Sequence, residues 1–296
     1  MQNSLPETVR RLGRLEVRAR HVVEGFLSGQ HRSPYFGQSL DFREHREYVR
    51  GDDPRHVDWK VWARQDRMVV KQYDEDTNLR GSLLVDVSAS MAYGRGPLTK
   101  HEYASTAACV LAYLLLRQND AVGCVAFHDR VRGEAPQRSH RAHLNTIAEL
   151  ISPAPTDPQT DLGANLELAA ARLPRRGVVF LISDLMGDLT ALRRGLSQLR
   201  KRGHDVVVLH VMDDDELDFP FERPTRFEGL ESEDLLSCDP RALRTGYLEA
   251  LGRFLDGARG ACLAERAQYA LLRTSAPLDS VLTAVLSERF DKRRAN

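Results

Sequence analysis

From residue 82 onward, short apolar runs rich in β-branched residues alternate with longer segments whose apolar residues recur every three or four positions. The runs have the length of strands and the longer segments that of helices. The predicted strands are 82–87, 121–127, 177–182, 205–212 and 268–273. The predicted helices are 100–117, 141–150, 162–173, 189–202, 241–257 and 277–289. Strands that are apolar on both faces and alternate with helices are typical of a parallel sheet covered on both sides.

The connections between such strands are right-handed crossovers, which favours an open sheet with helices on both faces. The sequence therefore predicts an α/β fold with a doubly wound, mainly parallel sheet of the Rossmann type. We expect two parts, residues 1–80 before the sheet and residues 81–296 containing it. An acidic insertion at about 213–239 holds eleven Asp and Glu residues against two Arg.

Residues 1–80 begin with a helix-start signal and continue with interleaved opposite charges. Ser4 and Glu7 have the spacing of a capping box, and apolar residues then recur at helical spacing to about Ser28. The following stretch to residue 80 predicts an ion-paired, turn-rich extension with one strand at 68–73. We expect Trp59 and Trp62 to be buried there, in a scaffold rather than a partner surface.

Composition excludes several classes of protein. The 42 Lys and Arg balance the 42 Asp and Glu, so the basic excess typical of a nucleic-acid binder is missing. The longest apolar stretch, 103–116, is shorter than the roughly 20 residues that cross a bilayer. We therefore expect a cytoplasmic protein without a membrane segment or signal peptide. The cysteines form no C-x-x-C pair and are predicted to be reduced thiols: Cys109, Cys124, Cys238 and Cys262.

Polar side chains follow the predicted strands where each strand ends. Asp86, Ser88 and Ser90 lie two residues apart after the first core strand, so an extended chain turns them the same way. Thr160 directly precedes a predicted helix, and Asp184 follows another strand. Ligands of open α/β sheets bind at the carboxyl ends of strands. Two carboxylates and three hydroxyls are hard oxygen ligands, so we predict that they hold one Mg²⁺ or Mn²⁺.

The order Asp-x-Ser-x-Ser, then Thr, then Asp resembles the metal-ion-dependent adhesion site of von Willebrand factor A domains. The motifs Gly51-Asp52-Asp53-x-Arg55, Val57-Asp58-Trp59 and Asp86-x-Ser88-x-Ser90-Met91 resemble the bacterial family called domain of unknown function 58. The similarity extends to Pro277-Leu278 near the end of the chain. It implies a von Willebrand factor A-like fold. Because such proteins are typically encoded beside MoxR-type AAA+ ATPases, it also implies an ATPase partner of that class.

The resemblance also implies a role for each site residue. Ser88, Ser90 and Thr160 would contact the cation through their hydroxyls, while Asp86 and Asp184 would act mainly through bound water. The remaining coordination position would take a carboxylate from a binding partner. The implied protein is a non-catalytic, cation-dependent adaptor that binds a MoxR-type ATPase, a client protein or both, with no small-molecule substrate.

The sequence leaves two alternatives open. The first is a Mg²⁺-dependent hydrolase or phosphatase. An enzyme of the haloacid dehalogenase type needs a second Asp two residues after the first as acid and base, and the sequence has Ser88 there. The second is a purely structural metal site, in which Asp161 or the acidic residues 213–216 fill the open position from within the chain.

Overall fold

The computed structural model describes residues 42–49, 57–65, 67–73, 79–155, 161–230 and 235–282. The described residues belong to two compact units, one within residues 32–78 and a larger one from residue 79 onward. The predicted helix ending near Ser28 and the site residue Thr160 lie outside the described residues.

The small unit is built on an antiparallel strand pair. Strand β1 (Phe42–Glu47) pairs with β2 (Val69–Tyr73), which confirms the strand predicted at 68–73. The seven-residue helix α2 (Trp59–Gln65) lies between them in the chain, and an ion pair joins Arg67 to Glu47. The expected burial of Trp59 and Trp62 is wrong, since they are 52% and 42% exposed. A unit this small buries only a small fraction of its surface on folding, so both rings stay partly exposed.

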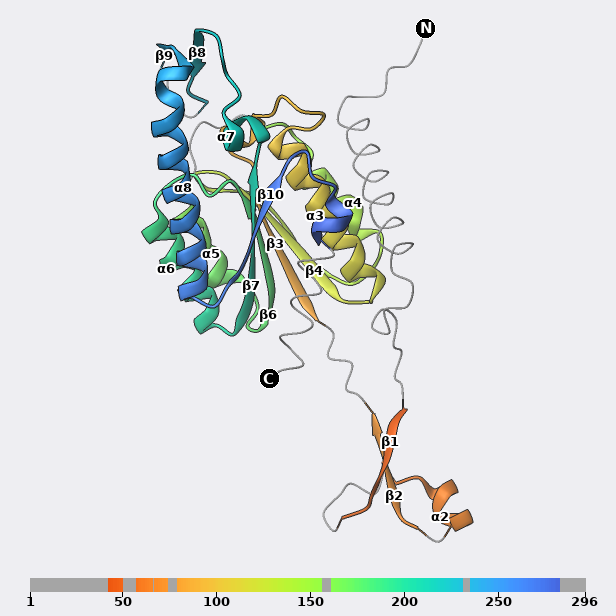
Figure 1. The fold of residues 1–296 in the computed structure, drawn as a ribbon. Helices are drawn as coiled ribbons and strands as arrows, with labels where there is room; N and C mark the ends of the chain where they lie inside the picture. The colour runs from red at the N-terminus through yellow and green to blue at the C-terminus, as the bar shows by residue number, and fades with distance from the viewer. Residues whose placement is uncertain are drawn as a thin grey trace, which may run out of the picture. The chain divides into compact units, whose positions relative to one another are not determined.

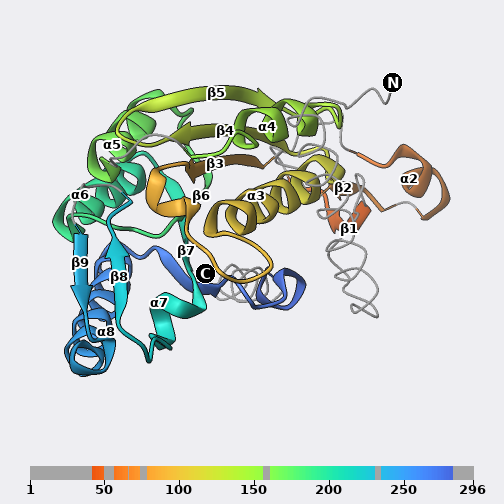
Figure 2. The same ribbon diagram turned by 90° about the horizontal axis from the view of Figure 1, so that it is seen from above.

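The large unit contains a six-stranded sheet. Its strand order is β10 (Gln268–Arg273), β7 (His204–Met212), β6 (Gly177–Ser183), β3 (Arg80–Asp86), β4 (Ala121–Phe127) and β5 (Val131–Arg138). The first five strands are parallel to one another, and β5 runs antiparallel to β4 at the edge. Figure 2 shows β7, β6, β3, β4 and β5 in this order, with β5 at the edge. The predicted mainly parallel, doubly wound α/β fold is confirmed.

Strand β5 was not predicted, because its sequence is polar. Among its residues only Ala135 is fully buried, and exposed and half-buried positions alternate along the rest. An edge strand with one solvated face needs no continuous apolar run. Its sequence therefore lacks the signal by which the other strands were recognised.

Helices cover both faces of the sheet (Figure 1). On one side lie α3 (Lys100–Arg117) and α4 (His143–Ile151). On the other lie α5 (Leu162–Arg172), α6 (Leu189–Lys201) and α8 (Pro240–Ala264). Helix α8 runs further than the predicted end at residue 257, and the helix predicted at 277–289 is described only as far as residue 282. In the described ranges no helix combines the length and apolar character needed to cross a membrane.

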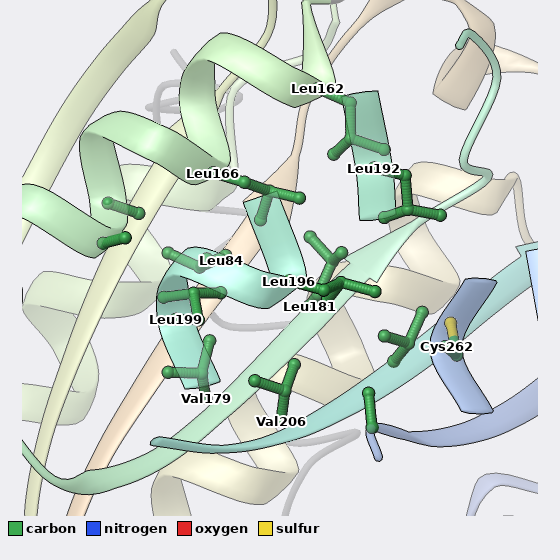
Figure 3. Close-up of a cluster of buried hydrophobic side chains, with 14 of the residues drawn as sticks. Leu84, Leu162, Leu166, Val179, Leu181, Leu192, Leu196, Leu199, Val206 and Cys262 are labelled. Atoms are coloured by element: carbon green, nitrogen blue, oxygen red, sulfur yellow. The ribbon is translucent and has the colours of Figure 1, made fainter. Parts of the chain in front are cut away.

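The core beneath α5, α6 and α8 consists mainly of aliphatic side chains (Figure 3). Leu84 and Leu181 from the sheet meet Leu166 and Leu196 from the helices, and all four are essentially inaccessible to solvent. Full burial of one such side chain stabilises the fold by about 1.5–3 kcal/mol. The thiol of Cys262 belongs to the same core, and all four cysteines are free, as expected.

The described part of the acidic insertion, residues 213–230 and 235–239, is folded. It contains the short helix α7 (Asp214–Asp218) and a hairpin of β8 (Thr225–Glu228) and β9 (Leu235–Cys238). The ring of Phe219 lies 4.5 Å from that of Tyr247 and 5.8 Å from that of Phe227, measured between centroids. These aromatic contacts pack the insertion against α8.

Candidate functional site

The candidate site lies where the winding of the sheet reverses. From β3 the chain crosses to β4 on one side, whereas from β6 it crosses to β7 on the other. Strands β3 and β6 are parallel neighbours, with Val85 opposite Ile182. Their carboxyl ends therefore bring Asp86, Ser183 and Asp184 together at the switch point, where ligands of such sheets bind.

Asp86 is completely buried. The backbone N–H of Ser88 donates to its Oδ1 at 3.0 Å, and the Ser183 hydroxyl donates to its Oδ2 at 2.6 Å. Neither partner is charged. Burial and the neighbouring charge of Asp184 raise the pKa of Asp86 from 3.8 to about 7, despite these hydrogen bonds. The fold thus holds a carboxylate where its charged form is disfavoured.

Asp184 is also buried, but it has a cation beside it. The ammonium of Lys100 donates to Oδ2 of Asp184 and to Oε1 of Glu216, each at 2.8 Å. Burial alone would raise the pKa of Asp184, but the charge and hydrogen bond of Lys100 hold it below its usual value. For Glu216, burial outweighs the attraction to Lys100, and its pKa is raised.

Two hydroxyls complete the cluster. The Oγ atoms of Ser88 and Ser90 are 3.1 Å apart, and the Ser90 hydroxyl also forms a hydrogen bond with Asp184. Ser90 lies in a short 3₁₀ turn, Ala89–Ala92, that follows β3. The structure therefore brings together Asp86, Ser88, Ser90 and Asp184 of the five predicted residues, whereas Thr160 lies outside the described residues.

The acidic residues considered as internal ligands have other partners. The Asp161 side chain is exposed and accepts from Ala164 N at 2.9 Å, which caps α5. Asp213 caps α7 and also accepts from the Thr274 hydroxyl at 2.7 Å. Glu216 is linked to the cluster through Lys100.

Lys100 is not among the predicted site residues, and Glu216 is predicted only as one of several possible internal ligands, although the sequence carries a signal for both. Lys100 is the first residue of α3, behind a Thr99–Glu102 capping box. A positive charge at a helix N-terminus opposes the helix dipole, so a lysine there suggests another use for its side chain. Asp213 and Glu216 have capping-box spacing, which predicts α7 within the acidic insertion.

The donor set fits a hard divalent cation. Asp86, Asp184 and Glu216 carry three formal negative charges against the single charge of Lys100. Within the described part of the chain, no three His, Cys, Asp or Glu side chains form a metal-binding group. A site here would therefore depend on serine hydroxyls and water, which suits Mg²⁺ better than a soft transition metal.

Fold and site together define a class: a doubly wound α/β protein with acids and hydroxyls at the switch point, similar to a von Willebrand factor A domain. The chain belongs to the DUF58 family, whose model, described as "Protein of unknown function DUF58", matches residues 44–253. The uncharacterized proteins Rv1480 of Mycobacterium tuberculosis and Mb1516 of Mycobacterium bovis are each 30% identical to it over 253 residues, covering 83% of this chain and 78% of the relative.

Two solved structures have a related arrangement. BatB of Bacteroides thetaiotaomicron is 17% identical with a TM-score of 0.47, over 71% of this chain and 98% of BatB. The SpRpn10 VWA domain is 13% identical with a TM-score of 0.42, over 70% of this chain and 94% of that domain. The strand order and the parallel pairing of the central strands define the fold class by themselves.

The raised pKa of Asp86 predicts how stability changes with pH. Between about pH 4 and pH 7 the native protein keeps a proton that the unfolded chain releases, because the native pKa is near 7 and the ordinary value is 3.8. The free energy of unfolding should therefore fall as pH rises through this window. Urea unfolding in chelator at pH 5 and pH 7.5 measures the fall. Asp86→Asn should reduce it, and an unchanged slope in this variant would contradict the assignment.

Proposed function

We propose that this protein is a non-catalytic adaptor that binds a partner protein through a divalent cation held by Asp86, Ser88, Ser90, Thr160 and Asp184. The observation that carries the proposal is the placement of Asp86. Its carboxylate is fully buried beside a second carboxylate and two hydroxyls, and among the residues that the structure describes only neutral groups donate to it. A buried charge without a cationic partner is costly, and a bound cation would compensate it.

The chain's own residues would prepare the site for docking. Ser88 N–H and the Ser183 hydroxyl orient the Asp86 carboxylate, and the Ser90 hydroxyl lies between Ser88 and Asp184. Hydroxyls carry no charge, so a bound Mg²⁺ or Mn²⁺ would stay electrophilic enough to accept a carboxylate from another protein. The chain supplies position and charge, and the partner supplies the last ligand.

We propose a MoxR-type AAA+ ATPase, a client of that ATPase, or both as the partner, in the cytoplasm. The family resemblance supports this choice. The ATPase would supply the energy for remodelling a client, because the docking site itself performs no bond-breaking step.

Co-purification tests the proposal. The MoxR-type ATPase encoded nearest to this gene should be captured by the immobilised protein in Mg²⁺ and lost in chelator. Asp86→Ala should lose capture as well. Asp188→Ala is the matched control, because Asp188 is an exposed carboxylate that caps α6 just beyond the site. Equal capture by Asp86→Ala and wild type would contradict cation-dependent docking.

The alternatives give different results in the same variants. A Mg²⁺-dependent phosphatase would hydrolyse a generic phosphate ester at a rate that Asp86→Ala abolishes. The position of its acid and base is held by Ser88, whose hydroxyl lies 3.1 Å from that of Ser90 and has no carboxylate of its own to offer as a general acid or base. A purely structural cation would instead make folding, rather than capture, depend on Mg²⁺.

A further inference from the structure

One buried ammonium is shared by two carboxylates from separate elements. Lys100 opens α3, and its side chain is 1% exposed. Its Nζ lies 2.8 Å from Asp184, which follows β6, and 2.8 Å from Glu216 on α7. Asp184 belongs to the proposed cation site, whereas Glu216 belongs to the acidic insertion. Lys100 therefore connects the two.

Glu216 is held firmly within α7. Its Oε2 accepts from the backbone N–H of Asp213 at 2.8 Å, which forms half of the capping box. The Tyr247 hydroxyl on α8 donates to the Glu216 carbonyl at 2.8 Å. Any change in the position of Lys100 therefore acts on the Glu216 carboxylate, which caps α7.

Lys100 also opposes a divalent cation in the proposed site. Its positive charge occupies one oxygen of Asp184, and like charges in a buried site repel each other strongly. The second carboxylate, on Glu216, draws the ammonium away from Asp184. The ammonium thus acts as a tethered competitor for the site, and Glu216 sets how strongly it competes.

We propose that Asp184 and Glu216 compete for Lys100, so that α7 responds to the occupancy of the cation site. This inference rests on the proposed function. A divalent cation at Asp86 and Asp184 shifts Lys100 toward Glu216, which strengthens that ion pair and tightens α7. By thermodynamic linkage, a firmer hold of Glu216 on Lys100 raises the affinity for the cation by the same factor.

Calorimetric titration with Mg²⁺ tests the competition. Lys100→Met should bind Mg²⁺ about tenfold more tightly than wild type, within the usual range of coupling between sites. Glu216→Gln should bind it several-fold more weakly, because Lys100 then stays on Asp184. Asp214→Asn removes one negative charge from the same helix, but Asp214 pairs with Arg273 and not with Lys100, so it should have little effect. In a Lys100→Met background, Glu216→Gln should have no more effect than Asp214→Asn.

Lys100→Met leaves two buried carboxylates uncompensated and risks unfolding. Hydrogen exchange is a readout that does not need this variant. In the wild type, Mg²⁺ should slow amide exchange at residues 214–219, and in Glu216→Gln it should not. If wild type binds Mg²⁺ and neither measurement responds to Glu216, the competition is overturned and the docking proposal stands. If only Lys100→Met binds Mg²⁺, the competition is supported and cation-dependent docking by the wild type is overturned. If no variant binds, both fail.

Discussion

Asp86→Asn should abolish Mg²⁺ binding while leaving the cation-free protein at least as stable as the wild type. The asparagine oxygen can still accept from Ser88 N–H, and its amide can donate to the Ser183 hydroxyl, so the local geometry is kept. The charge that attracts the cation is lost. At neutral pH the same substitution removes a buried charge that the native state disfavours, since the pKa of Asp86 is raised to about 7.

Urea unfolding with and without Mg²⁺ separates the two effects. If the cation is supplied at one hundred times its dissociation constant, the wild type should gain about 2.7 kcal/mol of unfolding free energy. Asp86→Asn should gain none. Asp188→Asn, at an exposed cap of α6, should gain as much as the wild type. A variant at residue 86 that still gains stability from Mg²⁺ would place the cation elsewhere.

The two expected effects of Asp86→Asn, loss of Mg²⁺ binding and no loss of stability without the cation, distinguish a binding role of this residue from a structural role. Replacing a residue that is kept for packing lowers the free energy of unfolding, whereas replacing Asp86 is expected to preserve or raise it. Burial of an acid with neutral hydrogen-bond partners is costly to the fold, and under the proposed function a bound cation offsets this cost. A similar argument does not apply to Asp184, whose charge is compensated by Lys100.

The central strands and their helices were predictable because burial on both faces leaves continuous apolar runs. Strand β4 and helix α3 have the predicted bounds. Where one face meets solvent the signal disappears, as in β5, and the hairpin of β8 and β9 is hidden among acidic residues. The apolar pattern of a sequence reflects which side chains an element buries, so edge strands and insertions are the hardest elements to predict from sequence.

The site was predictable only in part, for a related reason. Asp86, Ser88 and Ser90 are consecutive on one strand end, and the topology of parallel strands brings Asp184 to the same edge. Lys100 reaches the cluster from α3 through a long side chain, and Glu216 reaches it from an insertion. Contacts of that kind depend on how elements pack, which strand and helix periodicity does not encode.

Gly195→Ala should destabilise the protein, although alanine is the better helix former. Helices α5 and α6 approach so closely at this point that a Cβ on residue 195 would lie 2.4 Å from Cβ of Leu166. Leu166 is fully buried in the core, so it has no space to yield. The expected cost of overpacking is about 1–3 kcal/mol, and it exceeds the gain of roughly 1 kcal/mol in helix propensity.

Gly252→Ala on α8 is the matched control, because a Cβ there meets nothing within 4 Å. It should raise the free energy of unfolding by about 0.5–1 kcal/mol, since only helix propensity changes. Urea unfolding of both variants gives the comparison, and equal stabilisation by both would refute the close α5–α6 contact.

Helix α6 follows the loop that carries Asp184 and α5 follows residue 160. A forced separation of the helices should therefore also weaken Mg²⁺ binding in Gly195→Ala and leave it unchanged in Gly252→Ala, so that packing distant from the site sets how well the site is formed.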